Sequence, residues 1–268
     1  MAFVNDITLG QYYPAVSFVH RLDPRTKLIA VINLMTGLLI TFEPALLFGF
    51  LGLTILIVVC SRLPVALVLR NLRPFIWLFF LTILVHLFWT QGDVFFQVPI
   101  VKWTISKQGL SLGVIYAMRL ALLIIIAAIL TLSTSPIELT DALEKLMAPL
   151  NRIKVPVHEI VMMLTLSLRF IPTLLEEAQR LRNAQISRGA TFDGSLVRRI
   201  KSLIPLLLPL FVSAFRRADD LALAMDSRCY AGGEGRTSFR QLQFRGADIV
   251  ILSASFALLI GVVLYHTL

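Results

Sequence analysis

The residues whose types and spacing come closest to a catalytic pattern are two acidic clusters. Glu176-Glu177 form the first, and Asp219, Asp220 and Asp226 form the second. Paired carboxylate clusters bind magnesium and a diphosphate in polytopic prenyltransferases, so a magnesium-dependent membrane transferase acting on a lipid diphosphate is one open interpretation. Basic residues accompany the clusters, and this pattern favours a solvated charged helix face over a metal site.

The chain contains no other pattern that predicts catalysis or cofactor binding. His158-Glu159 lacks the second histidine of a zinc-protease helix, and the glycine-rich stretch 231–237 lacks the Gly-Lys-Ser/Thr ending of a phosphate-binding loop. Cys60 and Cys229 give neither a disulfide framework nor metal-ligand spacing. We therefore expect a chain that is not an enzyme by itself, with no catalytic residue, no metal site and no bound cofactor.

A Ser-Arg pair occurs twice, each time at the end of a charged helical pattern. The first stands in AQISRGATF and the second in ALAMDSRCY. Arginine is always charged and presents a planar fork of donors that matches a carboxylate. A single arginine at a helix end could merely compensate the helix dipole. Because the pair recurs at a second helix end, we favour docking into a partner protein.

The two segments that carry these pairs align at an offset of 40 residues. Four shared residues recur every three positions, which keeps them near one stripe of a helix, and a fifth directly follows the last of them. They are Ala178/Ala218, Leu181/Leu221, Ala184/Ala224, Ser187/Ser227 and Arg188/Arg228. The two segments are therefore expected to be long helices of one design.

The charges invert between the two copies. Glu176-Glu177 align with Arg216-Arg217, and Asp219-Asp220 follow in the second copy. We predict that the two helices cross with opposite charges paired, and that Ala178 and Ala218 allow a close approach. A proline in the first helix, Pro172, is expected to bend it.

The composition indicates a polytopic membrane protein. Of 268 residues, 57% are hydrophobic and 15% are charged, which leaves too little polar surface to cover a soluble globule. We expect an all-α fold with about five transmembrane helices and a cytoplasmic domain of amphipathic and long crossing helices. The expected spans are 28–42, 45–60, 74–90, 109–133 and 247–266. The first three are short and must include flanking residues or lie in a thinner bilayer.

The distribution of basic residues predicts the orientation. Arg21, Arg25 and Lys27 precede the first span, whereas the loop 91–108 has only two lysines. The positive-inside rule then places the N-terminus in the cytoplasm and the C-terminus outside. The segment 134–246, which holds 16 of the 25 basic residues, is cytoplasmic. This bias explains the net charge of +9 without a nucleic-acid partner.

Three regions of the chain follow from these spans. Residues 1–133 are expected to form a membrane domain with four transmembrane helices. Residues 134–246 are expected to form a cytoplasmic coupling domain of three helices, two of which end in a Ser-Arg motif. Residues 247–268 are expected to form the final transmembrane helix.

Local signals mark two helix starts and one buried charge. Asp23 before Pro24 is typical of a helix N-terminus, and Ser135 with Glu138 forms a capping box. Arg119 lies within the fourth span, where insertion of an arginine costs about 2.5–3.5 kcal/mol, so it needs a partner. Contact with another subunit stays open, but snorkelling or pairing with a backbone carbonyl of the same chain is favoured.

Three stretches, in order, resemble the transmembrane T component of energy-coupling factor (ECF) ABC-type transporters of vitamins and micronutrients. They are GQYYPAVSFVHRLDPRTKL, RFIPTLLEEAQRLRNAQISRGA and RRADDLALAMDSRCY. The resemblance covers most of the chain. It implies a subunit that joins two ABC ATPase subunits (EcfA and EcfA'-like) to a separate substrate-binding membrane subunit, the S component. The ATPases would bind ATP and magnesium. A shared module that serves several interchangeable S components is favoured over a dedicated cobalt or nickel system, which stays open.

In that family two long cytoplasmic helices cross, and each ends in a short Ala-Arg-Gly-like motif that docks into a groove of one ATPase. The docking residues that the resemblance implies are Ser187, Arg188, Gly189, Ser227, Arg228 and Cys229. Serine here replaces alanine before each arginine, and cysteine replaces glycine or serine after the second. Because small size is kept, docking is expected to survive. The implied function is the coupling of ATP-driven motion to vitamin uptake in the cytoplasmic membrane of a prokaryote.

Overall fold

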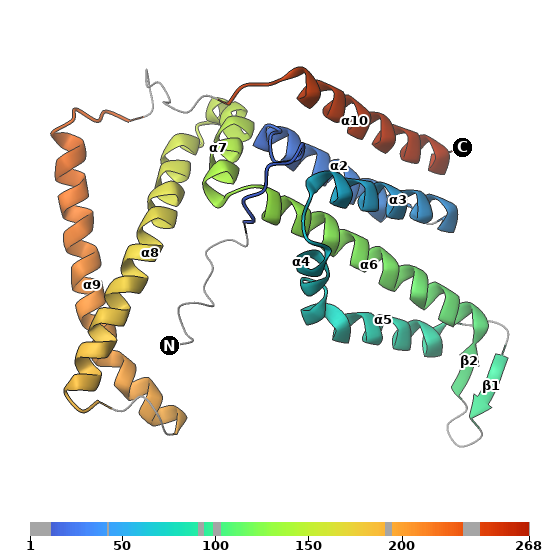
Figure 1. Cartoon of the computed structure of the whole chain (residues 1–268), viewed down its shortest axis with the longest axis horizontal. Helices are drawn as coiled ribbons and strands as arrows, with labels where there is room; N and C mark the ends of the chain where they lie inside the picture. The colour runs from blue at the N-terminus through green and yellow to red at the C-terminus, as the bar shows by residue number, and fades with distance from the viewer. Residues whose placement is uncertain are drawn as a thin grey trace. The chain divides into compact units, whose positions relative to one another are not determined.

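The computed structural model describes residues 12–41, 43–90, 94–98, 103–190, 195–232 and 242–267. The described residues are mostly helical, which confirms the all-α fold class (Figure 1). The α-helices are α2 (Pro24–Ile40), α3 (Pro44–Ser61), α4 (Val65–Arg70), α5 (Ile76–Trp89), α6 (Lys107–Ser133), α7 (Pro136–Met147), α8 (Val157–Ser187), α9 (Leu196–Asp226) and α10 (Gly246–Thr267). Two 3-10 helices are η1 (Arg73–Phe75) and η2 (Ala148–Ile153).

One short β-hairpin was not expected from the sequence. β1 (Val94–Val98) pairs antiparallel with β2 (Trp103–Ser106), and the register shifts between Val94 and Phe96. Both strands consist largely of aromatic and β-branched residues, which favour extended backbone. The hairpin therefore occupies part of the loop 91–108 between two expected spans.

The chain divides into two compact units. The larger unit contains Gly10–Ala142 and Leu242–Leu268, and the smaller unit contains Leu143–Gln241. The three sequence-based domains remain a prediction.

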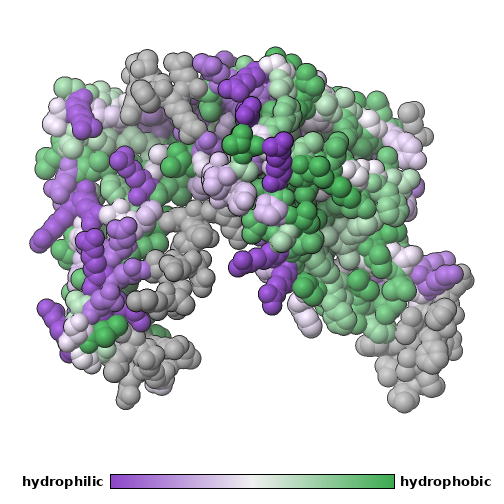
Figure 2. All heavy atoms as spheres, in the orientation of Figure 1, coloured by the Kyte–Doolittle hydropathy of each residue, from purple (hydrophilic) through white to green (hydrophobic). Residues whose placement is uncertain are grey.

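Helices of the larger unit pack around one apolar core. Leu38 of α2, Leu47 of α3 and Leu122 of α6 are almost fully buried there, and Val262 of α10 joins them. Apolar side chains also cover much of the outer surface of this unit (Figure 2). An apolar exterior over an apolar core is the arrangement expected of a helical bundle surrounded by lipid.

Five helical segments are long and apolar enough to cross a membrane: α3, Val65–Trp89, α6, α8 and α10. Five spans were also expected from the sequence, but the five helices differ, since α8 is among them and α2 is not. At 17 residues, α2 is at the lower end of the range for a spanning helix, about 17–25 residues. By contrast, α8 qualifies because its first half is apolar, although its second half carries most of its charges. The cytoplasmic placement of α8 remains a prediction.

Both predicted helix starts are confirmed. The Asp23 carboxylate accepts a hydrogen bond from the Arg25 N–H at 2.9 Å, with Pro24 as the first residue of α2. At α7, the Glu138 N–H donates to the Ser135 hydroxyl and the Ser135 N–H donates to the Glu138 carboxylate, both at 3.3 Å. These reciprocal bonds satisfy backbone donors that a helix start otherwise leaves unpaired.

Two long helices dominate the smaller unit. α8 and α9 each span 31 residues and run antiparallel, with their crossing visible in Figure 1. α9 changes direction within its first half, and prolines 205 and 209 lie inside this helix. Pro172 lies inside α8, which continues through it; the predicted bend there stays a prediction. His158 pairs with Glu144 at 2.9 Å and so ties the start of α8 to the end of α7.

Candidate functional site

The end of α8 places Arg188 on a tight backbone turn. Gly189, which follows it, has a left-handed backbone with φ of +86°. Its N–H donates to the Ile186 carbonyl at 2.9 Å, and the Ala190 N–H donates to the Gln185 carbonyl at 3.0 Å. This pair of bonds is the Schellman motif, which satisfies carbonyl groups that a helix end would otherwise leave unpaired.

The end of α9 repeats this geometry. Cys229 has a left-handed backbone with φ of +55°. Its N–H donates to the Asp226 carbonyl at 2.9 Å, and the Tyr230 N–H donates to the Met225 carbonyl at 3.1 Å. Each donor and each acceptor lies 40 residues after its counterpart in α8. The repeat seen in the sequence is thus a repeat of backbone conformation, with Arg228 at the place of Arg188.

The position after each arginine therefore requires more than a small side chain. Glycine adopts a left-handed backbone at no steric cost, whereas other residues lose roughly 1–2 kcal/mol there. Gly189 meets this requirement, and Cys229 meets it under strain. Side-chain size alone therefore does not describe what this position needs.

All six residues of the two motifs are exposed in the chain. The two serine hydroxyls donate back to their own helices, Ser187 to the Asn183 carbonyl at 3.1 Å and Ser227 to the Ala224 carbonyl at 3.0 Å. The serines thus behave as small, internally satisfied residues.

At the crossing, the structure brings Glu177 and Arg217 together. The Arg217 guanidinium donates to the Glu177 carboxylate at 2.6 Å, and both side chains are partly buried. These residues are one of the charge pairs aligned at the 40-residue offset. Ala178 is partly buried, while Ala218 is exposed.

For the remaining charged residues of the predicted crossing, a part in it stays a prediction. Glu176, Arg216, Asp219 and Asp220 are all exposed. Within the described residues, no group of three or more His, Cys, Asp or Glu side chains could hold a metal ion. In the two acidic clusters, Glu177 is paired with Arg217, and the other four carboxylates, including Asp226, are exposed.

The two arginine motifs lie at opposite ends of the crossed pair. Arg228 lines a pocket together with Met162, Leu166 and Arg169, which belong to the first half of α8. Arg188 stands at the other end of α8, about 30 Å further along the helix axis. The two exposed arginines therefore stand at separate places on one pair of helices.

A buried polar cluster in the larger unit was not foreseen from the sequence. Asp248 of α10 is fully buried and accepts hydrogen bonds from the Asp23 N–H at 2.9 Å and the Arg245 N–H at 2.8 Å. It thereby joins the starts of α10 and α2, although Asp23 and Asp248 are 225 residues apart. A buried carboxylate with two backbone donors holds both segments in place because either donor would be costly to leave unpaired.

Two basic residues of the HRLDPRTKL block complete this cluster. The Lys27 ammonium is buried and donates to the carbonyls of His20 at 3.2 Å and Ser133 at 3.0 Å, the latter at the end of α6. The Arg25 guanidinium donates to the Leu242 carbonyl at 3.3 Å and lies over the Phe244 ring. The block that is specific in sequence is therefore a set of ties between helix ends.

Arg119 has partners within its own chain. It is buried in α6, donates to the Thr41 carbonyl just beyond the end of α2, and lies over the Tyr116 ring. A cation at a helix C-terminus interacts favourably with the helix dipole. This geometry matches the favoured interpretation, pairing with a backbone carbonyl.

Comparisons with known proteins agree with one another. A family model described as cobalt transport protein (CbiQ) matches residues 15–239. A protein of Heliobacterium modesticaldum is 50% identical over 255 residues, 94% of each chain. One of Acidaminococcus fermentans is 45% identical over 261 residues, 96% of each chain. One of Bacillus subtilis is 43% identical over 252 residues, 93% of this chain and 94% of the relative. All three are named energy-coupling factor transporter transmembrane protein EcfT.

The apolar helices and these relatives define a multi-pass membrane protein that is a non-catalytic transporter subunit. More specifically, the chain belongs to the EcfT family, the transmembrane component of energy-coupling factor transporters. This confirms the resemblance noted in the sequence, and the relatives' names do not support the transferase interpretation.

Proposed function

We propose that this chain couples two ABC ATPase subunits to a separate substrate-binding membrane subunit, the S component, and so drives vitamin uptake. The observation that carries this proposal is the repeated helix end. Arg188 and Arg228 stand on the same left-handed turn, both exposed, at the ends of two crossed helices. Because the turns fix the backbone, docking needs to order only the side chains of the two arginines.

The separation of the two arginines supports two ATPase partners. Arg188 follows the end of α8, whereas Arg228 lies against the first half of α8, about 30 Å away along that helix, which is too far for one groove to receive both. Each motif would insert into one ATPase, with the guanidinium bound to a carboxylate. Loss of one member of such a pair, once it is buried, costs about 2–5 kcal/mol of association.

The crossing of α8 and α9 would carry the motion. When ATP binding draws the ATPases together, the arginine-bearing ends move with them and the helices tilt about the region of the Glu177–Arg217 pair. The apolar faces of these helices would then release or reorient the S component. ATP and magnesium are bound by the ATPases, and this chain need not contact the vitamin.

In this proposal the docking region is cytoplasmic. The N-terminus lies in the cytoplasm and the C-terminus outside, in the cytoplasmic membrane of a prokaryote, as the basic residues indicate. The coupling domain is 134–246, between a membrane domain of 1–133 and a last span within 247–268. Several S components would use the same module in turn.

Co-purification tests the proposal. The chain is co-expressed with candidate ATPase subunits and the ATPases retained per chain are counted. We expect two, with Arg188→Glu releasing one and Arg228→Glu releasing the other. A matched control reverses two exposed charges at the end of η2, Arg152→Glu with Lys154→Glu, and should keep both ATPases. Retention of both ATPases by the variant with Arg188→Glu and Arg228→Glu together would contradict the proposal.

A further inference from the structure

The motif at the end of α9 does not stand alone, because it borders a pocket that α8 also lines. The pocket has a volume of about 570 Å³ and lies within the smaller unit. Its apolar walls come from both helices: Met162 and Leu166 from α8, and Leu221 and Met225 from α9. The docking arginine of α9 therefore stands at the mouth of a cavity that the two helices build together.

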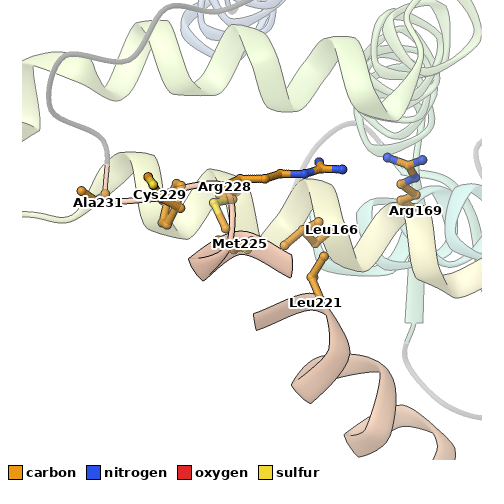
Figure 3. A pocket seen from close by; sticks show the side chains of 10 residues that line it. Leu166, Arg169, Leu221, Met225, Arg228, Cys229 and Ala231 are labelled. Carbon is orange, nitrogen blue, oxygen red and sulfur yellow. The ribbon is translucent and has the colours of Figure 1, made fainter. Parts of the chain in front are cut away.

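Two arginines face this pocket. Figure 3 shows the Arg228 side chain extending past Leu166 toward Arg169. The guanidinium groups of both arginines lie on the same side of Leu166. None of the ten residues that line the pocket is acidic. Like charges that face one cavity repel each other, and an anion placed between them removes that repulsion. The charge of the pocket is therefore complementary to a carboxylate.

The apolar walls strengthen this preference. When a partner covers the pocket, water leaves a surface made of leucine and methionine side chains, and the local dielectric constant falls. Attraction between a guanidinium and a carboxylate grows as the dielectric constant decreases. A glutamate or aspartate could enter with its methylene groups packed against Leu166 and Met225 and its carboxylate paired with the arginines.

We propose that Arg169 is the second cationic residue of the Arg228 docking site, and that the pocket receives an acidic side chain of the partner ATPase. This inference rests on the proposed function and adds a residue and a ligand chemistry to it. Arginine forks suit bidentate binding, so two of them hold a carboxylate in a defined orientation.

One consequence concerns how α8 is moved. α8 then contacts one ATPase through Arg188 at its end and the other through Arg169 near its middle. Movement of either ATPase acts on α8, and the ATPase bound at Arg228 acts on both helices at once. The two docking sites would therefore differ in construction although their turns are alike.

The test measures ATPase affinity for the full chain in nanodiscs of zwitterionic lipid, with one ATPase titrated at a time. Arg169→Glu should weaken binding of the ATPase that Arg228 holds by about tenfold or more and leave the other unchanged. Arg169→Lys should recover part of the loss, since the charge is kept and the fork is not. Arg152→Glu, an exposed reversal outside the pocket, should bind like the unmodified chain.

A double-mutant cycle adds a second criterion, with unchanged binding of the ATPase at Arg188 as the control for folding. If Arg169 and Arg228 hold one carboxylate, the losses caused by Arg169→Ala and Arg228→Ala should not multiply in the double variant. Multiplying losses would show separate contacts and overturn the inference.

The outcomes separate the inference from the proposed function. If the unmodified chain binds neither ATPase, the proposed function fails and the inference fails with it. If the chain binds both and Arg169→Glu binds equally well, only the inference fails. A loss seen only when anionic lipid is present would mean that the pocket takes a lipid phosphate, and this would also overturn the inference.

Discussion

Gly189 and Cys229, forty residues apart, occupy the same position of the same backbone motif, with φ of +86° and +55°. Each follows the arginine of a helix end, and each donates its N–H to the carbonyl three residues earlier. The two helix ends therefore share one backbone conformation. The two ends are nevertheless unequal, because only glycine adopts this backbone without strain.

Substitution of glycine for Cys229 should strengthen the end of α9. The relief of left-handed strain exceeds the entropy that glycine adds to the unfolded chain, so we expect a gain of about 0.5–1 kcal/mol. Hydrogen exchange of the amides near 225–230 should slow. Gly189→Ala should instead destabilise the end of α8, by about 1 kcal/mol. Faster exchange in Cys229→Gly would contradict this account.

The Glu177–Arg217 pair can be tested by exchange of its charges. Glu177→Arg should destabilise the crossing by about 0.5–1 kcal/mol, a modest figure because both side chains are partly exposed. The swap of Glu177→Arg with Arg217→Glu should restore most of that loss in thermal unfolding. Glu176 is an exposed neighbour, so Glu176→Arg, which makes the same charge change, should destabilise the crossing less than Glu177→Arg does. A swap no better than the single reversal would argue against pairing at this crossing.

Asp248 should matter for the stability of the larger unit and not for ATPase docking. Asp248→Asn keeps the shape but loses one of two acceptors for the N–H groups of Asp23 and Arg245, which should cost about 1–3 kcal/mol of unfolding free energy. Ser253→Ala, an exposed change on the same helix, should stay within about 0.5 kcal/mol. An unchanged melting temperature in Asp248→Asn would show that the tie contributes little.

Substitution of Arg119 can show whether this arginine pairs within its own chain or contacts another subunit. Arg119→Leu leaves the Thr41 carbonyl without this donor, so the isolated chain should lose about 1–3 kcal/mol of stability. Assembly with the S component should be unaffected once the chain is folded. If instead the isolated chain keeps its stability and assembly is lost, the arginine acts between subunits.

Local signals in the sequence predicted much of this structure. The capping box at Ser135 and Glu138, the helix start at Asp23 and the two arginine-bearing helix ends are each encoded within a few neighbouring residues. The alignment at 40 residues also singled out Glu177 and Arg217, because a repeated helix design keeps equivalent residues on equivalent faces.

Other features depend on contacts that the sequence does not display. The partner of the Asp23 N–H is Asp248, 225 residues away, and no local pattern connects them. The left-handed backbone of Cys229 is hidden because the usual signal for it is glycine. Arg169 lines the Arg228 pocket through antiparallel packing of two helices, whereas the sequence repeat compares them in parallel.

ATP-driven vitamin uptake by the assembled transporter tests the central claim most directly. The measurement compares the unmodified chain with the Arg188→Glu and Arg228→Glu double variant at equal levels of membrane insertion. The account predicts that the double variant inserts normally and that its uptake is abolished, because the ATPases no longer move the two helices. Normal uptake by that variant would contradict it.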